Sequence, residues 1–212
     1  MRYYHYISGA KLEMLYEQIA PEARERIAVD LGVNIGIVSA NFRSEKVENA
    51  HHQKIQILER HLGGRVGSLL APKPYIADTA IAAWGPFENY EYVVYFGGYE
   101  SGTHFGLMGS FSNCVSAPNA SPSGYSLERY IVHTLARRKL LPPRTPTSSC
   151  KGIPAAEANE KAFEGVVMAN QCSIEPKAKV RFLARTVIAR ARRGDHCYGV
   201  YIGTPIYVAT ED

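Results

Sequence analysis

Residues 95–98 read Tyr-Phe-Gly-Gly, residues 105–110 read Phe-Gly-Leu-Met-Gly-Ser, and residues 199–208 read Gly-Val-Tyr-Ile-Gly-Thr-Pro-Ile-Tyr-Val. The first two stretches taken together, and the third by itself, each place an apolar strand directly against glycine and a small hydroxyl residue. Glycine weakens a strand unless the chain must bend or another group must approach the backbone closely. The stretches therefore predict strands with either close backbone approach or simple strand-ending turns, and the sequence leaves both interpretations open.

The glycine-rich strands predict a site for an anionic small molecule. Backbone N–H groups beside a Ser or Thr hydroxyl suit an anion, as in nests and phosphate loops. The predicted ligand-binding residues of these strands are Gly97, Gly98, Gly109, Ser110, Gly203 and Thr204, with Tyr95 or Tyr201 available to stack on a planar ring.

Length and composition indicate an ordinary globular protein. The chain has 212 residues, of which 46% are hydrophobic and 21% charged, so it can bury a core without disulfides or metal. We predict one domain over residues 1–212, with a flexible proline-rich loop near 142–156. The net charge of +4 permits an anionic ligand without demanding nucleic acid, which is not excluded as a partner.

Cysteine spacing and hydropathy favour a cytoplasmic protein. Cys114, Cys150, Cys172 and Cys197 form no CxxC pair, so we predict no metal site, no cofactor and reduced thiols. The N-terminus lacks the apolar region of a signal peptide, and no run of 18 apolar residues predicts a membrane helix. We therefore expect no membrane partner.

Periodicity and turn residues predict an α/β or α+β fold with the element order βαβαβββαβαββ. The sheet is expected to be mixed and partly parallel, with flanking helices, a central antiparallel hairpin and a diverged internal duplication behind the twin glycine motifs. The predicted strands are 2–8, 33–42, 76–84, 91–97, 103–109, 163–170, 198–202 and 205–209, and the predicted helices are 9–20, 44–62, 127–140 and 177–193, with a loop at 116–124.

The segment 177–193 is rich in arginine and lysine and carries apolar residues at spacings of three and four. As a helix it would hold Arg181 and Arg185 one turn apart, where they could clamp a phosphate. The alternative is a solvated basic face that complements the helix dipole.

Catalytic motifs are absent from the sequence: there is no GxSxG elbow, no phosphate loop and no HExxH. His104 and His196 occupy matching positions relative to the two glycine motifs. A histidine pair beside a phosphate could perform acid–base cleavage of a phosphodiester, so both are candidate catalytic residues. Histidines that merely begin strands are the plainer interpretation.

The chain resembles an uncharacterised bacterial domain family, a domain of unknown function of actinobacterial type found with conflict and defence genes. The segments that carry the resemblance span nearly the whole chain: Arg2–Ser8 with Lys11–Leu15, Trp84–Pro86, Tyr95–Gly98, Gly106–Ser110, Phe182–Ala184 and Ile202–Ala209. The resemblance implies one domain and a defence setting with an effector protein as partner, and it assigns no catalytic residue.

Three functions follow as hypotheses. The leading one is a cytosolic sensor that binds an anionic small molecule, most plausibly a nucleotide or cyclic nucleotide, with Arg181 and Arg185 as countercharges. The second is a metal-independent phosphodiesterase that uses His104 and His196. The third is a protein-interaction subunit in which the glycine strands only pack, and the oligomeric state is left open by all three.

Overall fold

The computed structural model describes residues 2–33, 44–87, 90–115, 155–172, 177–191 and 198–211. Six strands and four α-helices lie in these ranges, together with two short 3-10 turns, η2 (Gly63–Arg65) and η3 (Phe111–Asn113). In chain order they are β1 (Arg2–Ile7), α1 (Gly9–Glu17), α2 (Pro21–Leu31), α3 (Ser44–Leu62), β2 (Tyr75–Phe87), β3 (Tyr90–Glu100), β4 (Thr103–Ser110), α5 (Ala155–Cys172), β5 (Ala178–Arg190) and β6 (Gly199–Glu211).

Five of the strands close into a barrel, and β1 pairs with the C-terminal part of β6, beyond the end of its ladder with β4. β2, β3 and β4 form an antiparallel meander, β4 pairs with β6 in parallel, and β5 pairs antiparallel with both β6 and β2. In the chain, α5 lies between β4 and β5, the third and fourth strands of the barrel. This Greek-key order and these strand directions match the topology of the OB barrel, which is also built from five strands.

Alternating side chains fill the barrel. Along β3 and β4 the buried aromatic and aliphatic residues Phe96, Phe105 and Leu107 belong to the inner cluster. Phe105 stacks on Phe182 of β5 with ring centroids 5.5 Å apart, so opposite walls meet across the interior. Each such side chain contributes about 1.5–3 kcal/mol when it leaves water, which makes this cluster the main source of barrel stability.

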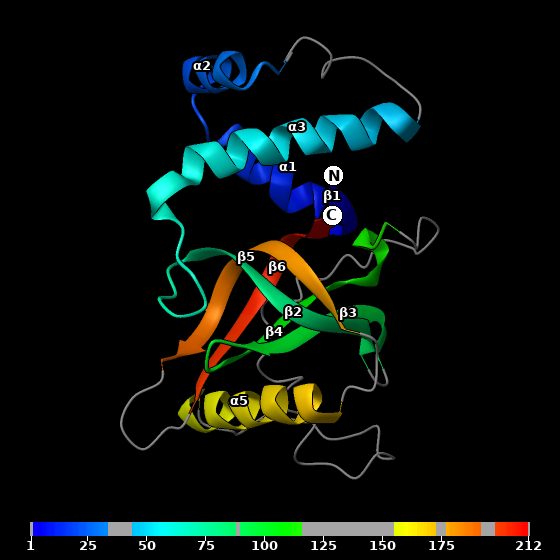
Figure 1. Ribbon diagram of the computed structural model, residues 1–212, viewed down its shortest axis with the longest axis vertical. Helices are drawn as coiled ribbons and strands as arrows, with labels where there is room; N and C mark the ends of the chain where they lie inside the picture. The colour runs from blue at the N-terminus through cyan, green and yellow to red at the C-terminus, as the bar shows by residue number, and fades with distance from the viewer. Residues whose placement is uncertain are drawn as a thin grey trace.

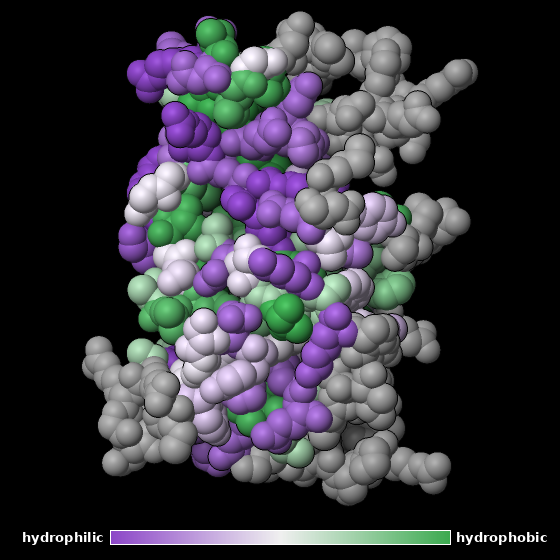
Figure 2. Space-filling view, viewed as in Figure 1, coloured by the Kyte–Doolittle hydropathy of each residue, from purple (hydrophilic) through white to green (hydrophobic). Residues whose placement is uncertain are grey.

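Two helical layers cover the outside of the barrel (Figure 1). On one side α1 and α3 pack on the outer faces of β5 and β6, where Leu183 and Tyr207 are fully buried, and α2 packs against α3 on the side away from the barrel (Figure 1). On the opposite side α5 packs on β3, β4 and β6 through Val166, Met108 and Ile202. On the face seen in Figure 2, hydrophilic residues lie over α3, and hydrophobic residues form separate patches over α2 and over the barrel.

Tyrosine rings lie directly on glycines at three places in the barrel wall. A Cβ atom added to Gly109 would lie 2.5 Å from the Tyr6 hydroxyl, and one added to Gly203 would lie 2.6 Å from the Tyr201 hydroxyl. Outside the barrel, Tyr95 occupies the space over Gly97 and Gly106 in the same way. The glycines of the two motifs are therefore required by close packing of aromatic rings.

The predicted fold class is confirmed: the sheet is mixed and partly parallel, has flanking helices and contains the central β3–β4 hairpin. The strands expected at 198–202 and 205–209 are one continuous strand, β6. A β-bulge, where the pairing with β5 shifts between Ala184 and Leu183, lets the strand pass Pro205 without ending.

Two predicted elements have the wrong type. Residues 177–193 were expected to form a helix, but β5 occupies Ala178–Arg190, because Val180, Phe182 and Ala184 alternate into the barrel. Residues 163–170 were expected to form a strand, but they belong to α5, in which Ala162, Val166 and Ala169 recur at helical spacing and are buried. Helix α2 was not predicted, and it begins at Pro21, a residue well suited to the first turn.

Several predictions fall on residues whose structure is not described. The strand expected at 33–42, the loop at 116–124 and the helix at 127–140 lie outside the described ranges except for residue 33. The same holds for all of the proline-rich stretch 142–156 except its last two residues.

The contact between Tyr6 and Gly109 yields a test of the packing. Gly109→Ala should lower the free energy of unfolding by about 1–3 kcal/mol, because the added methyl group overlaps a fully buried ring. Gly85→Ala is the matched control, since a Cβ atom at that strand position meets nothing within 4 Å. Urea denaturation of both variants measures the difference, and equal stabilities would contradict the packing argument.

Candidate functional site

The two glycine-rich strands are neighbours in the sheet. β4 pairs with β6 in parallel, with Leu107 opposite Gly203. Inside the barrel, the Tyr6 ring occupies the space over Gly109 and the Tyr201 ring occupies the space over Gly203. Tyr201 is fully buried in that interior, and burial raises the pKa of its hydroxyl.

The hydroxyl residues beside these glycines have partners within the chain. Lys11 donates to the Thr204 hydroxyl and, over 3.4 Å, to the Pro205 carbonyl oxygen. The Ser110 hydroxyl lies 2.8 Å from the Ser112 hydroxyl. Thr204 is buried, so its contact with Lys11 fixes the start of α1 against β6.

Arg181 takes part in an ion-pair network on the opposite side of the barrel from α5. Its Nη2 atom and Nη1 of Arg2 each lie 3.1 Å from a carboxylate oxygen of Glu59, to which the Tyr207 hydroxyl also donates. Burial opposes ionisation of Glu59, but the hydrogen bonds from Tyr207 and Arg2 and the two positive charges hold its pKa below the usual value. This network ties β1, β5 and β6 to α3.

The predicted clamp of Arg181 and Arg185 rested on a helix that the structure does not contain. In strand β5 four residues span about 13 Å, whereas four residues of a helix bring two side chains together. Arg185 is exposed at a position that pairs with Thr204, and Arg181 is engaged with Glu59. The two guanidinium groups therefore lie too far apart on the strand for a helical clamp.

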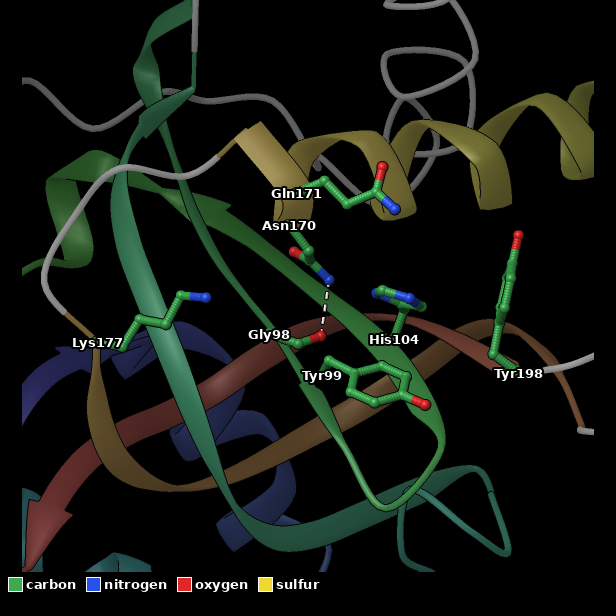
Figure 3. A pocket seen from close by; sticks show the side chains of 7 residues that line it. All are labelled: Gly98, Tyr99, His104, Asn170, Gln171, Lys177 and Tyr198. Atoms are coloured by element: carbon green, nitrogen blue, oxygen red, sulfur yellow. Dashed lines mark hydrogen bonds between the residues drawn. The ribbon is translucent and has the colours of Figure 1, made fainter.

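A pocket of about 380 Å³ opens between the C-terminal end of α5 and the β3–β4 hairpin. In Figure 3, Asn170 and Gln171 approach from α5, Tyr99 and His104 from the hairpin, and Lys177 and Tyr198 stand on opposite sides. Of the candidate site residues named from the sequence, Gly98 and His104 line this pocket. The complete lining is Gly98, Tyr99, His104, Asn170, Gln171, Lys177 and Tyr198.

Asn170 fixes one wall of the pocket. Its side-chain nitrogen donates to the carbonyl oxygens of Gly98 (2.7 Å) and Phe105 (3.0 Å), and its oxygen accepts from the Tyr95 hydroxyl over 2.8 Å. A Cβ atom on Gly97 would overlap that oxygen. The glycine at 97 therefore lets the amide reach the sheet, and both amide hydrogens are used within the chain.

His104 is held between two tyrosine rings. Its ring centroid lies 4.6 Å from that of Tyr99 and 5.1 Å from that of Tyr198, the latter edge to face. Burial lowers the pKa of His104, so the imidazole is neutral at pH 7. Its Nδ1 atom is buried and has no hydrogen-bond partner among the described residues.

Tyr198 is positioned by Arg190 of β5. The guanidinium carbon of Arg190 lies 5.9 Å from the Tyr198 centroid and 4.9 Å from that of Phe163, and its Nη1 atom forms a 2.5 Å ion pair with Glu160. Arg190 thereby links α5, β5 and the segment before β6. The Tyr198 ring is consequently held beside His104 by contacts on both sides.

This arrangement combines aromatic surfaces, a neutral imidazole and a lysine in one pocket. Such a set can stack on a planar ring, exchange hydrogen bonds with it and attract a negative charge. Within the described part of the chain no group of three His, Cys, Asp or Glu side chains could hold a metal ion. The second candidate histidine, His196, lies outside the described residues.

Sequence reasoning missed Tyr99, Asn170, Gln171, Lys177 and Tyr198. Asn170 follows Val166 by one helical turn, so a helical interpretation of residues 155–172 would have aimed it at the sheet. Lys177 was counted in a basic helix that is in fact the approach to β5. No spacing signal joined Tyr198 to His104, because strand pairing between β4 and β6 brings them together.

Comparison with known proteins gives a family but no relative of known activity. The model of DUF7019, described as a family of unknown function, matches residues 2–212. No curated protein and no solved structure matches the chain. Among the described residues, no helix has both the length and the apolar character needed to cross a membrane.

The hydrogen bonds of Asn170 predict a stabilising role. Asn170→Ala should cost about 1–3 kcal/mol in the free energy of unfolding, because it strips partners from buried polar groups at the hairpin. Gln171→Ala, which truncates the exposed neighbouring amide, is the matched control and should change stability little. Thermal denaturation followed by circular dichroism compares the two, and a neutral Asn170→Ala would refute the role.

The lowered pKa of His104 predicts a loss of stability in mild acid. A histidine whose pKa is depressed by folding binds its proton more readily in the unfolded chain, so stability falls as the pH drops below about 6.5. His104→Gln should lose less stability than the wild type between pH 7.5 and pH 5.5 in urea titrations. Parallel pH profiles for the two proteins would show that His104 contributes nothing to this effect.

Proposed function

We propose that this chain, which belongs to the DUF7019 family, is a cytosolic ligand-binding domain whose pocket takes an anionic molecule with a planar ring, most simply a nucleotide. The pocket lies between the end of α5 and the β3–β4 hairpin. Sensing of such a ligand within a bacterial defence system is the wider role that we propose. Its effector partner would respond to the occupied state.

The observation that carries the proposal is the neutral His104 imidazole between Tyr99 and Tyr198 at the edge of the pocket. Its Nδ1 atom is buried and has no partner among the described residues, so a ligand in the pocket would hydrogen-bond to the other ring nitrogen, Nε2. A nucleobase offers both a π face for the tyrosines and ring N–H or exocyclic amino groups for the imidazole.

Charge and size support the same ligand class. Lys177 supplies a positive charge at the pocket rim, where a phosphate would approach. A volume of about 380 Å³ lies within the 300–1,000 Å³ range typical of small-molecule sites. Asn170 is committed to the hairpin carbonyls, so selectivity falls to His104, Gln171 and the tyrosine hydroxyls.

A phosphodiesterase that uses His104 and His196 is the alternative from the sequence. His104 in its neutral form is chemically able to accept a proton, which favours this alternative to a limited extent. Turnover of a cyclic nucleotide in the absence of metal would support the enzyme. Release of the same nucleotide unchanged would support the sensor.

The two exposed tyrosines of β3 allow a matched test. Tyr99 lines the pocket and is 53% exposed, whereas Tyr92 on the same strand is 55% exposed and does not line it. Tyr99→Ala should weaken mononucleotide binding about fivefold to a hundredfold, the effect of losing one base–aromatic stack. Tyr92→Ala should leave binding unchanged.

Isothermal titration calorimetry with AMP, GMP, CMP and UMP measures these affinities. His104→Ala should lower the affinity for the best-binding nucleotide about tenfold relative to the wild type, the scale of one hydrogen bond. Absence of binding by all four nucleotides, or equal loss in Tyr99→Ala and Tyr92→Ala, would overturn the proposed function.

A further inference from the structure

We infer that the pocket is one end of a binding face for single-stranded nucleic acid, formed by a row of side chains across the outside of the barrel. This inference rests on the proposed nucleotide pocket and extends it along the sheet. The row runs from β5 through β2 and β3 to β4 and consists of Lys179, Ile81, Tyr99 and His104.

Strand register places these four side chains next to one another. Lys179 pairs with Ile81, and Tyr99 pairs with His104. The ladder between β2 and β3 ends at the pair of Ala82 and Gly98, so Ile81 and Tyr99 are the next residues beyond that end on the two adjacent strands. Side chains of directly opposed residues lie about 5 Å apart, so each of the two registered pairs forms one contiguous surface.

The row is outside the barrel and open to solvent beyond the pocket. Tyr99 is 53% exposed, Ile81 is 43% exposed and Lys179 is exposed. An aliphatic residue and a tyrosine left exposed together, next to a pocket, offer stacking surface for a second base. The two helical layers pack on other parts of the barrel wall.

Lysines accompany the row on β5. Lys177, directly before β5, lines the pocket, and Lys179 follows it two residues later on β5, the spacing of side chains on one face of a strand. Two residues of a strand span roughly 7 Å, which is close to the separation of successive phosphates in an extended nucleotide chain. Alternating positive charge and aromatic surface is the pattern by which proteins bind single strands with little sequence preference.

The row crosses the strands that form the binding face in OB barrels, which supports the inference by analogy. In OB barrels the second and third strands form the face that binds oligonucleotides, together with the loop between the fourth and fifth strands. Here those strands are β3 and β4, which supply Tyr99 and His104. Tyr198 stands immediately before the fifth strand, β6.

Fluorescence anisotropy of the full chain with a fluorescein-labelled twelve-residue thymidine strand tests the inference, with thymidine monophosphate as the competing mononucleotide. The oligonucleotide should bind at least tenfold more tightly than the mononucleotide. Lys179→Ala should weaken the oligonucleotide about threefold to tenfold and reduce the slope of log affinity against log salt by about 0.7. The same variant should leave mononucleotide affinity unchanged.

The control variant is Lys161→Ala, on α5 in an ion pair with Glu157 and away from the row, which should change neither affinity. Mononucleotide binding without a gain for the oligonucleotide would overturn this inference and leave the proposed function standing. Oligonucleotide binding that is insensitive to both Lys179→Ala and Tyr99→Ala would place the strand elsewhere and also overturn it. Failure of both thymidine probes to bind would overturn this inference, and the titrations with AMP, GMP, CMP and UMP would then decide the proposed function separately.

Discussion

A barrel of five strands has a narrow interior, and this chain places tyrosine rings against its wall by omitting the Cβ atoms beneath them. Tyr6 lies on Gly109 and Tyr201 on Gly203, both inside the barrel. Any other residue at these glycines would drive a methyl group into a ring. A slip of one residue between β4 and β6 would carry β1 along with β6 and move Tyr6 off Gly109, so this glycine also helps to fix the register of the parallel pair.

Each of these rings then uses its hydroxyl to fasten a neighbouring element. Asn113 of η3 donates to the Tyr6 hydroxyl over 3.2 Å, and the Tyr201 hydroxyl lies 3.3 Å from that of Thr186 on β5. Burial, as the largest effect, raises the pKa of Tyr6 to about 12, so the group remains a neutral hydrogen-bonding partner across the physiological range. Close packing and polar contacts thus act through the same side chains.

The parts of the fold that followed from the sequence are those in which one periodicity is unambiguous. The β3–β4 hairpin and α3 have such patterns, and both were predicted. Residues 177–193 do not, because Val180, Leu183 and Val187 fit a helix while Val180, Phe182 and Ala184 fit a strand. Pairing with β2 and β6 along nearly the whole length of β5 decides for the strand, and that contribution is tertiary.

Tertiary pairing, which the sequence does not display, also explains why most residues of the pocket were not predicted. The glycine motif around residue 97 lies one layer of side chains away from the pocket. Gly97 gives Asn170 room to reach the carbonyl oxygens of Gly98 and Phe105, and these bonds hold the hairpin that carries His104. Of the two interpretations that the sequence left open, the structure shows close approach to the backbone at Gly97, and the group that approaches is the protein's own amide. The pocket itself depends on residues from α5, β5 and the segment before β6, which only the closed barrel brings together.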